Sequence, residues 1–186
     1  MRLTLFVVFF LGAQLWAQGD DAAMQAMMKH AMPGDQHKMM AGMVGSYTAE
    51  MTIWFAPGAP PQKVDSSAEY SMEMGGRYLK QSFSAMYNGM PLTGMGFTGY
   101  DNTLKKYISI WFDSMGTGMA FGEGDYDASK DLLEISGHST DPISGKKAPY
   151  RFTLQGLKNK DHVFSMYSPG PDGKEFKSVE IKYTRK

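Results

Sequence analysis

Residues 47–55 read YTAEMTIWF, and this stretch decides the fold because apolar and polar side chains alternate along it. A period of two is typical of a β-strand with one buried face. The apolar face consists of Tyr47, Ala49, Met51, Ile53 and Phe55. Residues 56–61, APGAPP, must form a loop, since prolines cannot donate to a strand ladder.

The same pattern continues to the end of the chain. Turn-forming residues recur at 88–89, 101–102, 127–130 and 171–173, and each group favours a hairpin. Short connections between consecutive strands predict an all-β, antiparallel up-and-down barrel of about ten strands that closes on itself. Such a barrel encloses more space than side chains fill, since about eight strands already hold one small ligand. The strands after the first are predicted at 63–73, 76–87, 91–99, 106–113, 118–126, 132–139, 147–156, 162–167 and 176–184.

The first 17 residues predict a secretory signal peptide. Arg2 is followed by an apolar stretch over residues 3–16, and Ala17 is the predicted cleavage position. The apolar stretch is shorter than the roughly 20 residues that span a bilayer. We therefore expect an exported protein, periplasmic or extracellular, with no membrane span after cleavage; an uncleaved anchor is the alternative.

Charge and cysteine content exclude several classes of function. The 186 residues include 19 basic and 19 acidic side chains and no cysteine. This balance argues against a nucleic-acid partner, for which a basic excess is expected. Without cysteine there are no disulfides, no thiol catalysis and no thiolate metal ligands. No oligomeric state follows from the sequence.

A methionine-rich arm is predicted over residues 18–34, ahead of a lipocalin-like barrel domain over residues 35–186. Residues 22–31 are prone to form a helix. Asp35 is the predicted N-cap of a second helix over 36–44, which we expect to plug one end of the barrel.

The arm carries residues that could bind Cu(I), because thioether and imidazole groups together suit that soft ion. The hypothetical ligands are Met24, Met27, Met28, His30, Met32 and His37. The alternative is packing, since flexible methionine fills irregular gaps. Haem is a further alternative, with His138 or His162 as ligand, although no motif places either residue at such a site.

Two segments carry candidate ligand-binding residues. Arg77 follows a Gly-Gly bend and shares strand parity with Leu79, so it could face inward and pair with a ligand carboxylate. It could equally be a rim residue bonded to a protein carboxylate. The segment WFDSMGTG at residues 111–118 adds Trp111 and Asp113, and Tyr107 precedes them on the same predicted strand.

Asp113 and Ser114 could form a polar site at a barrel end, either for a ligand head group or for an enzyme. The alternative is turn formation, in which both side chains cap a glycine-rich turn. No histidine is near in sequence, and the carboxylates are scattered, so neither a hydrolytic triad nor an acid/base pair is indicated. No catalytic residue is assigned.

Several blocks occur in a characteristic order: PGAPP (57–61), GGRYL (75–79), GYDN (99–102), KKY (105–107), WFDSMGTG (111–118), EGDY (123–126), MYSPGPDGKEF (166–176) and EIKYTRK (180–186). Over residues 37–186 the chain thereby resembles the bacterial family called domain of unknown function fifteen-seventy-nine. The resemblance implies a calycin-type barrel, the group that includes lipocalins and fatty-acid-binding proteins. It implies no activity and no site residues. Tyr47 departs from the family, in which many members have Trp.

The leading hypothesis is therefore an exported barrel that binds a small, largely apolar ligand in its interior. Metal handling by the arm, or an enzyme near Asp113 and Ser114, are the alternatives. The alternation marks two faces of each strand without identifying the inward one.

Overall fold

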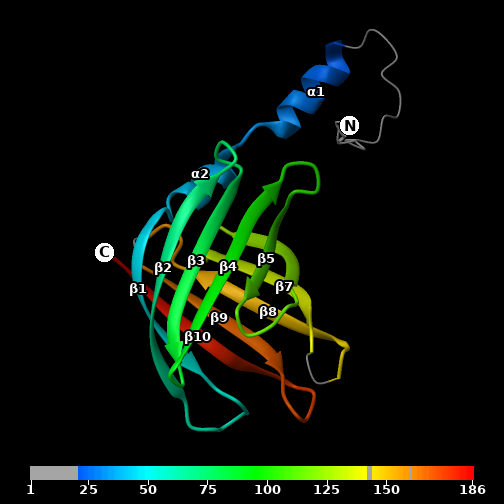
Figure 1. Cartoon of the computed structure of the whole chain (residues 1–186). Helices are drawn as coiled ribbons and strands as arrows, with labels where there is room; N and C mark the ends of the chain where they lie inside the picture. Colours follow the sequence, from blue (N-terminus) through cyan, green and yellow to red (C-terminus); the bar gives the residue numbers. More distant parts are fainter. Residues whose placement is uncertain (1–20, 142–143, 160) are drawn as a thin grey trace, which may run out of the picture. The chain divides into compact units, whose positions relative to one another are not determined.

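Ten antiparallel strands form one closed barrel in the computed structural model, which describes residues 21–141, 144–159 and 161–186 (Figure 1). Each strand pairs with its neighbours in sequence, and β1 also pairs with β10. The predicted up-and-down barrel is confirmed. The strands are β1 (Gly45–Ile53), β2 (Gln62–Glu73), β3 (Tyr78–Tyr87), β4 (Met90–Asp101), β5 (Lys106–Asp113), β6 (Ala120–Asp127), β7 (Leu132–Thr140), β8 (Lys147–Gln155), β9 (His162–Pro169) and β10 (Glu175–Arg185).

The predicted turn residues make the hairpins. Asn88 and Gly89 have φ of 49° and 77°, the left-handed pair that matches strand twist in a two-residue hairpin. Asp101 accepts hydrogen bonds from the backbone N–H groups of Thr103 and Leu104 at 2.7 and 2.9 Å. Asp127 does the same for Ser129 at 2.9 Å. These turns set the register of the strands that they join.

The strand predicted over 76–87 begins later than expected, at Tyr78. Gly75 and Gly76 adopt φ of 66° and 85°, and this left-handed backbone interrupts the ladder. Arg77 therefore lies in the β2–β3 turn, where its Nη1 donates to the Met74 carbonyl at 3.1 Å. Its strand parity with Leu79 consequently does not determine where its side chain points.

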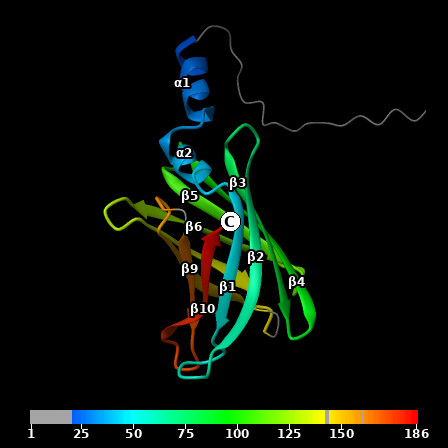
Figure 2. The same cartoon turned by 90° about the vertical axis from the view of Figure 1, so that its left-hand side faces the viewer.

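Helix α2 (Asp35–Ala41) lies at one end of the barrel and packs against β3 and β4 (Figure 2). Met40 is 1% exposed, and Met43 in the following turn is also buried. We call this end, where β1, β3, β5, β7 and β9 begin, the closed end. The opposite end carries the β1–β2, β3–β4, β5–β6, β7–β8 and β9–β10 connections, and we call it the open end.

The predicted N-cap of this helix was wrong. Gly34 is the N-cap, and Asp35 is the first helical residue. The cause is His37, whose Nδ1 accepts the Gly34 N–H at 3.0 Å and so holds the chain extended just before the helix. The helix also ends before residue 44. There Arg185 donates to the carbonyls of Gly42 and Val44 at 2.6 and 2.8 Å and ties the connection to β10.

Helix α1 (Asp21–Ala31) belongs to a separate unit of the chain, which ends at Ala31, whereas α2 and the barrel belong to the second unit. A helix was expected here. The predicted signal peptide lies outside the described residues. Among the described helices, neither combines the length and apolar character that crossing a membrane requires.

Candidate functional site

On the whole, inward side chains are more deeply buried at the closed end of the barrel than at the open end. Strand alternation turns one face of every strand inward, and at the closed end these side chains are buried, as with Tyr47 and Leu133. At the open end the inward side chains of Tyr87, Leu92 and Trp111 are only half-buried. Solvent therefore reaches the barrel lumen from this end.

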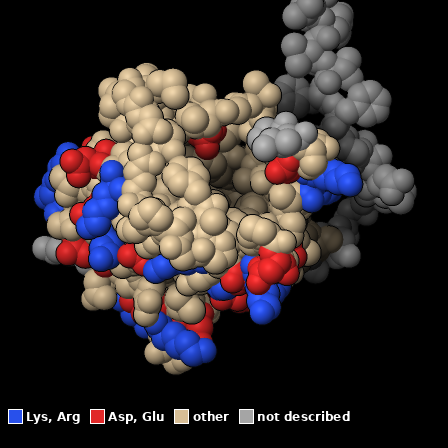
Figure 3. Space-filling model, turned by 90° about the horizontal axis from the view of Figure 1, so that it is seen from below, with Lys and Arg blue, Asp and Glu red and all other residues tan. Residues whose placement is uncertain are grey.

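Exposed apolar side chains surround the open end. They belong to the connections and strand ends there, and their exposed fractions lie between 55% and 66%: Phe55, Met86, Met90, Met115 and Met119. Figure 3 looks at this end and shows a hollow bordered largely by residues other than Lys, Arg, Asp and Glu. A further hollow of about 440 Å³ adjoins the rim and is lined by Trp54, Pro57 and Phe176 among others. Together these features form an apolar entrance.

Trp111 forms part of the lumen wall because β4 has glycines where it would otherwise have inward side chains. A Cβ atom on Gly94 would lie 2.2 Å from Cζ2 of Trp111, and one on Gly96 would lie 2.9 Å from its Cε3. The indole thus lies flat against β4. Its edge contact with Phe83, at 6.3 Å between ring centroids, supports it from the next strand. Trp111 thus lies on the inward face of β5, between β4 and the barrel interior.

Asp113 shares the inward face of β5 with Trp111. Its Oδ2 accepts the indole Nε1–H at 2.8 Å, and its Oδ1 accepts the Met115 backbone N–H at 2.9 Å. Among the described residues, no Lys or Arg forms an ion pair with this carboxylate. The structure thus brings together two of the predicted ligand residues.

Ser114 stabilises the start of the turn that follows β5. Its Oγ accepts the Thr93 N–H at 3.0 Å, and its own N–H donates to the Thr93 carbonyl at 2.8 Å. One oxygen of Asp113 likewise caps the turn. These bonds correspond to the turn-forming alternative for Ser114 and for one oxygen of Asp113.

The other two predicted ligand residues lie at the closed end, remote along the strands from Trp111 and Asp113. Arg77 occupies the β2–β3 turn near α2, where its charge helps to lower the pKa of His37, after the larger effect of burial. Tyr107 is 3% exposed and packs edge-on against Tyr100 at 4.9 Å. Burial raises the pKa of Tyr107, so its hydroxyl stays protonated. The four candidates do not form one cluster.

A buried polar cluster fills the closed end. The His162 ring stacks on Tyr183 at 4.5 Å and meets Tyr47 and Tyr70 edge-on at 5.1 and 5.6 Å. Gln81 donates to the Tyr183 hydroxyl at 2.9 Å, and Tyr70 OH lies 3.4 Å from His162 Nε2. Among the described residues, no buried side-chain nitrogen or oxygen lacks a hydrogen-bond partner. The polar groups of this cluster are satisfied by other residues of the fold, so we interpret the cluster as part of the core.

The histidines do not fit the haem hypothesis. His162 is 3% exposed and enclosed by tyrosines, and burial, then Arg185, lowers its pKa to about 4. His138 pairs with Phe121 and Pro149 and lies on the outward face of β7, in alternation with buried Leu133 and Ile135. Neither imidazole faces the open lumen, where a haem could enter.

The hypothetical copper ligands divide between the two units of the chain. Met24, Met27 and Met28 lie on α1 and are exposed, and His30 follows them there. Met32 is exposed and belongs to the second unit. His37 is buried, with Nδ1 bonded to Gly34 and a further hydrogen bond to the Tyr100 backbone, so its ring belongs to the fold. No group of three His, Asp or Glu side chains in the described ranges could hold a metal ion.

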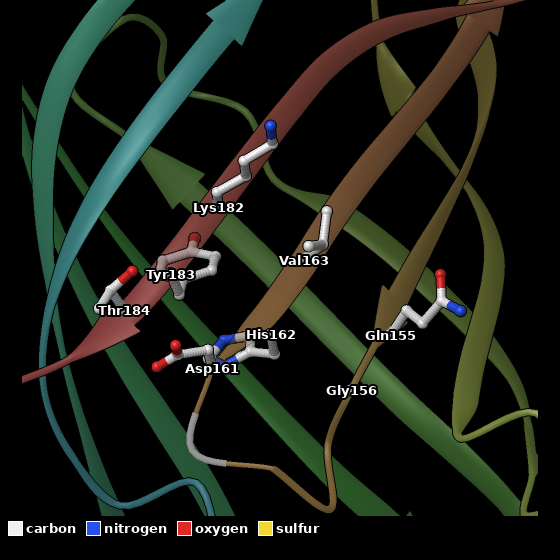
Figure 4. Close-up of a pocket in the computed structure, with 8 residues that line it drawn as sticks. All are labelled: Gln155, Gly156, Asp161, His162, Val163, Lys182, Tyr183 and Thr184. Atoms are coloured by element: carbon white, nitrogen blue, oxygen red, sulfur yellow. The ribbon is translucent and has the colours of Figure 1, made fainter.

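One further hollow, of about 320 Å³, lies where β8, β9 and β10 meet the closed end (Figure 4). His162 and Tyr183 lie side by side on neighbouring strands there, but each is only 3% exposed. The other lining residues are Gln155, Gly156, Asp161, Val163, Lys182 and Thr184. These residues offer no convergent set of apolar and polar groups, unlike the open end.

Two lumen residues were not predicted from the sequence: Tyr150 and Met166. Tyr150 stacks near Phe152, at 6.3 Å, and burial raises its pKa to about 12. Tyr150 and Phe152 are alternate residues in the segment YRF, and alternate residues of a strand share a face. The sequence alone therefore indicates that Tyr150 lies on the same face as Phe152. Met166 lies opposite Phe152 on β9, and only the register reveals that.

The fold defines a small β-barrel protein with one closed, antiparallel, ten-stranded barrel. Over residues 32–185 the chain matches the family described as "Protein of unknown function (DUF1579)", and it belongs to that family. A solved structure, "Crystal Structure of Rv2717c from M. tuberculosis", is similar, with a TM-score of 0.61 and 11% sequence identity. The similarity covers 83% of this chain and 99% of that chain, and at this identity it shows the fold alone. No curated protein matches.

Proposed function

We propose that this protein binds a small, largely apolar molecule in the barrel lumen, entering through the open end. The observation that carries the proposal is the contrast between the two ends. Inward side chains such as Tyr47, Tyr70 and Leu133 are buried at the closed end, whereas Trp111, Tyr150 and Met166 are half-buried at the open end. Ligand sites are typically concave and apolar, with a few placed polar groups.

The rim supports this direction of entry. Phe55, Met86 and Met119 expose more than half of their side-chain surface, and exposed apolar groups gathered at one place commonly mark a binding surface. Methionine side chains are flexible enough to adapt to an apolar guest as it passes. Export is part of the proposal and rests on the leader predicted over residues 1–17, which mass spectrometry of the secreted or periplasmic protein would test.

Filling the lumen tests the proposal. Ala120 lies opposite Trp111 in the β5–β6 register and on the same inward face, so Ala120→Trp places a second indole in the space we assign to the ligand. Isothermal titration with decanol should give one site in the native protein and none in Ala120→Trp. The control is Ser84→Trp, because Ser84 is exposed on the outward face of β3. Equal binding by both variants, or no binding by the native protein, would refute the proposal.

A second candidate function is Cu(I) handling by the arm. Met24, Met27 and Met28 are exposed and lie within about one turn of each other on one face of α1, and such thioethers suit the soft ion. Replacing all three by Leu preserves the helix and its apolar character. A bathocuproine competition assay should then show weakened Cu(I) binding; unchanged binding would remove this candidate.

A further inference from the structure

The charged side chains that face the lumen differ between its two ends. Along the described strands, the inward positions carry one Arg, Arg185 at the closed end, and one Asp, Asp113 at the open end, and no Lys or Glu. Arg185 is engaged there with Tyr47 and with the carbonyls of Gly42 and Val44. Asp113 is therefore the charge that a molecule in the open part of the lumen meets.

The connections that border the open end carry no net charge, and Lys177, which lines the adjoining hollow, is paired with Glu180. The connections at residues 54–61, 88–89 and 114–119 contain no Asp, Glu, Lys or Arg, and those at 141–146 and 170–174 each contain one acid and one base. A carboxylate attracts an opposite charge within a few ångströms, and a charge-assisted hydrogen bond adds to this attraction. The two hydrogen bonds that Asp113 accepts, from Trp111 and Met115, leave further lone pairs on both oxygens.

Trp111 adds a second group that favours a cation. Its indole lies on the inward face of β5 and packs against Gly94 and Gly96 of β4. Among aromatic side chains, indole attracts cations best. The same indole donates its N–H to Asp113, so the carboxylate and the ring face lie within one rigid pair.

We propose that the ligand is an apolar molecule with a cationic amine head, whose ammonium group pairs with Asp113 and lies against the face of Trp111 while its apolar body fills the lumen toward Phe83 and Phe152. This inference rests on the proposed lumen-binding function and specifies its ligand class. It also reverses the sign of ligand charge expected from Arg77, which lies in a turn at the other end of the barrel.

Three probes with the same chain and different heads test it: decylamine, decanol and decanoic acid, titrated calorimetrically into the full chain at neutral pH. Decylamine should bind about tenfold more tightly than decanol, since a charge-assisted hydrogen bond is roughly twice as strong as a neutral one. Decanoic acid should bind most weakly, because its carboxylate meets Asp113. The advantage of the amine should shrink as salt is added.

The variant Asp113→Asn keeps an oxygen that can accept the Trp111 N–H but removes the charge. It should lose about tenfold in decylamine affinity and keep decanol affinity within about twofold. Asp172→Asn is the matched control, because Asp172 is an exposed acid in the β9–β10 turn at the same end. It should leave both affinities unchanged.

A measurement on the native protein tests the same pairing without relying on a variant that could fold incorrectly. The indole N–H resonance of Trp111 should shift more with decylamine than with decanol, because the amine competes for Asp113 Oδ2. Equal affinity for amine and alcohol, preference for the acid, or a preference that survives Asp113→Asn would overturn the inference and leave lumen binding intact. Failure of all three probes to bind would overturn the proposed function as well.

Discussion

The indole Nε1–H of Trp111 donates a hydrogen bond of 2.8 Å to Oδ2 of Asp113, two residues further along the same face of β5. Residues i and i+2 of a strand always share a face, so β5 presents an aromatic plane and a carboxylate together. The glycines of β4 then give the indole room to lie flat. Local sequence and neighbouring strand thus build one wall of the lumen.

Truncating this wall should weaken ligand binding. Trp111→Ala removes the indole that forms part of the lumen wall, and we expect decanol affinity to fall about tenfold or more, on the scale of a lost large apolar contact. Isothermal titration measures the change. The control is Ile110→Ala, which shortens the adjacent, outward residue of β5. Comparable losses in both variants would mean that binding does not occur in the lumen.

The fit between Gly94 and Trp111 predicts a coupled effect on stability. In Gly94→Ala the new methyl group would overlap the indole, and we expect the free energy of unfolding to fall by about 1–3 kcal/mol, measured with urea. In a Trp111→Ala background the same change should cost little, so a double-mutant cycle should be strongly non-additive. Gly116→Ala is the control, because no atom lies within 4 Å of its added methyl group. Additive effects would contradict the close packing that we describe.

The hydroxyl of Tyr47 links the segment between α2 and β1 to the last strand, β10, through two hydrogen bonds. It donates to the Met43 carbonyl at 2.9 Å and accepts from Arg185 Nε at 3.1 Å. Tyr47→Phe leaves both partners unsatisfied in a buried setting and should lower the free energy of unfolding by about 1–3 kcal/mol. Tyr167→Phe serves for comparison, since that ring stacks under Arg151 on the outer face and its hydroxyl has no such role. Equal stability of the two variants would argue against this link.

Stability should fall in mild acid because of His162. Its folded pKa of about 4 lies below the ordinary value of 6.5, so the unfolded chain binds more protons between these values. The stabilisation is complete above about pH 6.5 and disappears as the pH falls toward 4, a loss on the order of 3 kcal/mol. Burial lowers the pKa of His37 as well, which adds in the same direction.

Urea unfolding at about pH 7.5 and about pH 4.5 measures this dependence. His162→Gln should be less stable at the higher pH and should lose less on acidification than the native protein. His138→Gln, a change on the outer face, should keep the full dependence. Identical pH profiles for native protein and His162→Gln would show that another group controls acid stability.

Strand number and order could be predicted because alternation and turn chemistry are local properties. The β3–β4 hairpin needs only Asn88 and Gly89, whose preference for left-handed backbone is visible in the sequence. The helix start was wrong because a side chain beyond the usual capping residues, His37, fixes Gly34. The capping preferences of single residues do not predict this hydrogen bond.

The site was predictable only in part. Trp111 and Asp113 could be selected as residues at a strand end, but alternation does not say which face is inward. The fit of Trp111 on Gly94 depends on the β4–β5 register, and the His162 cluster depends on closure of β1 against β10. These contacts join residues far apart in sequence, so the pattern along one strand cannot reveal them.

The central claim is that ligands occupy the lumen at the open end. Isotope-filtered NOE spectra of the labelled protein with unlabelled decanol test it most directly. We predict NOEs from the decyl chain to the Trp111 ring, the Tyr150 ring and the Met166 methyl group, and none to Ile110 or Phe112 on the outer face of β5. NOEs confined to outer-face residues, or none at saturating decanol, would contradict the account.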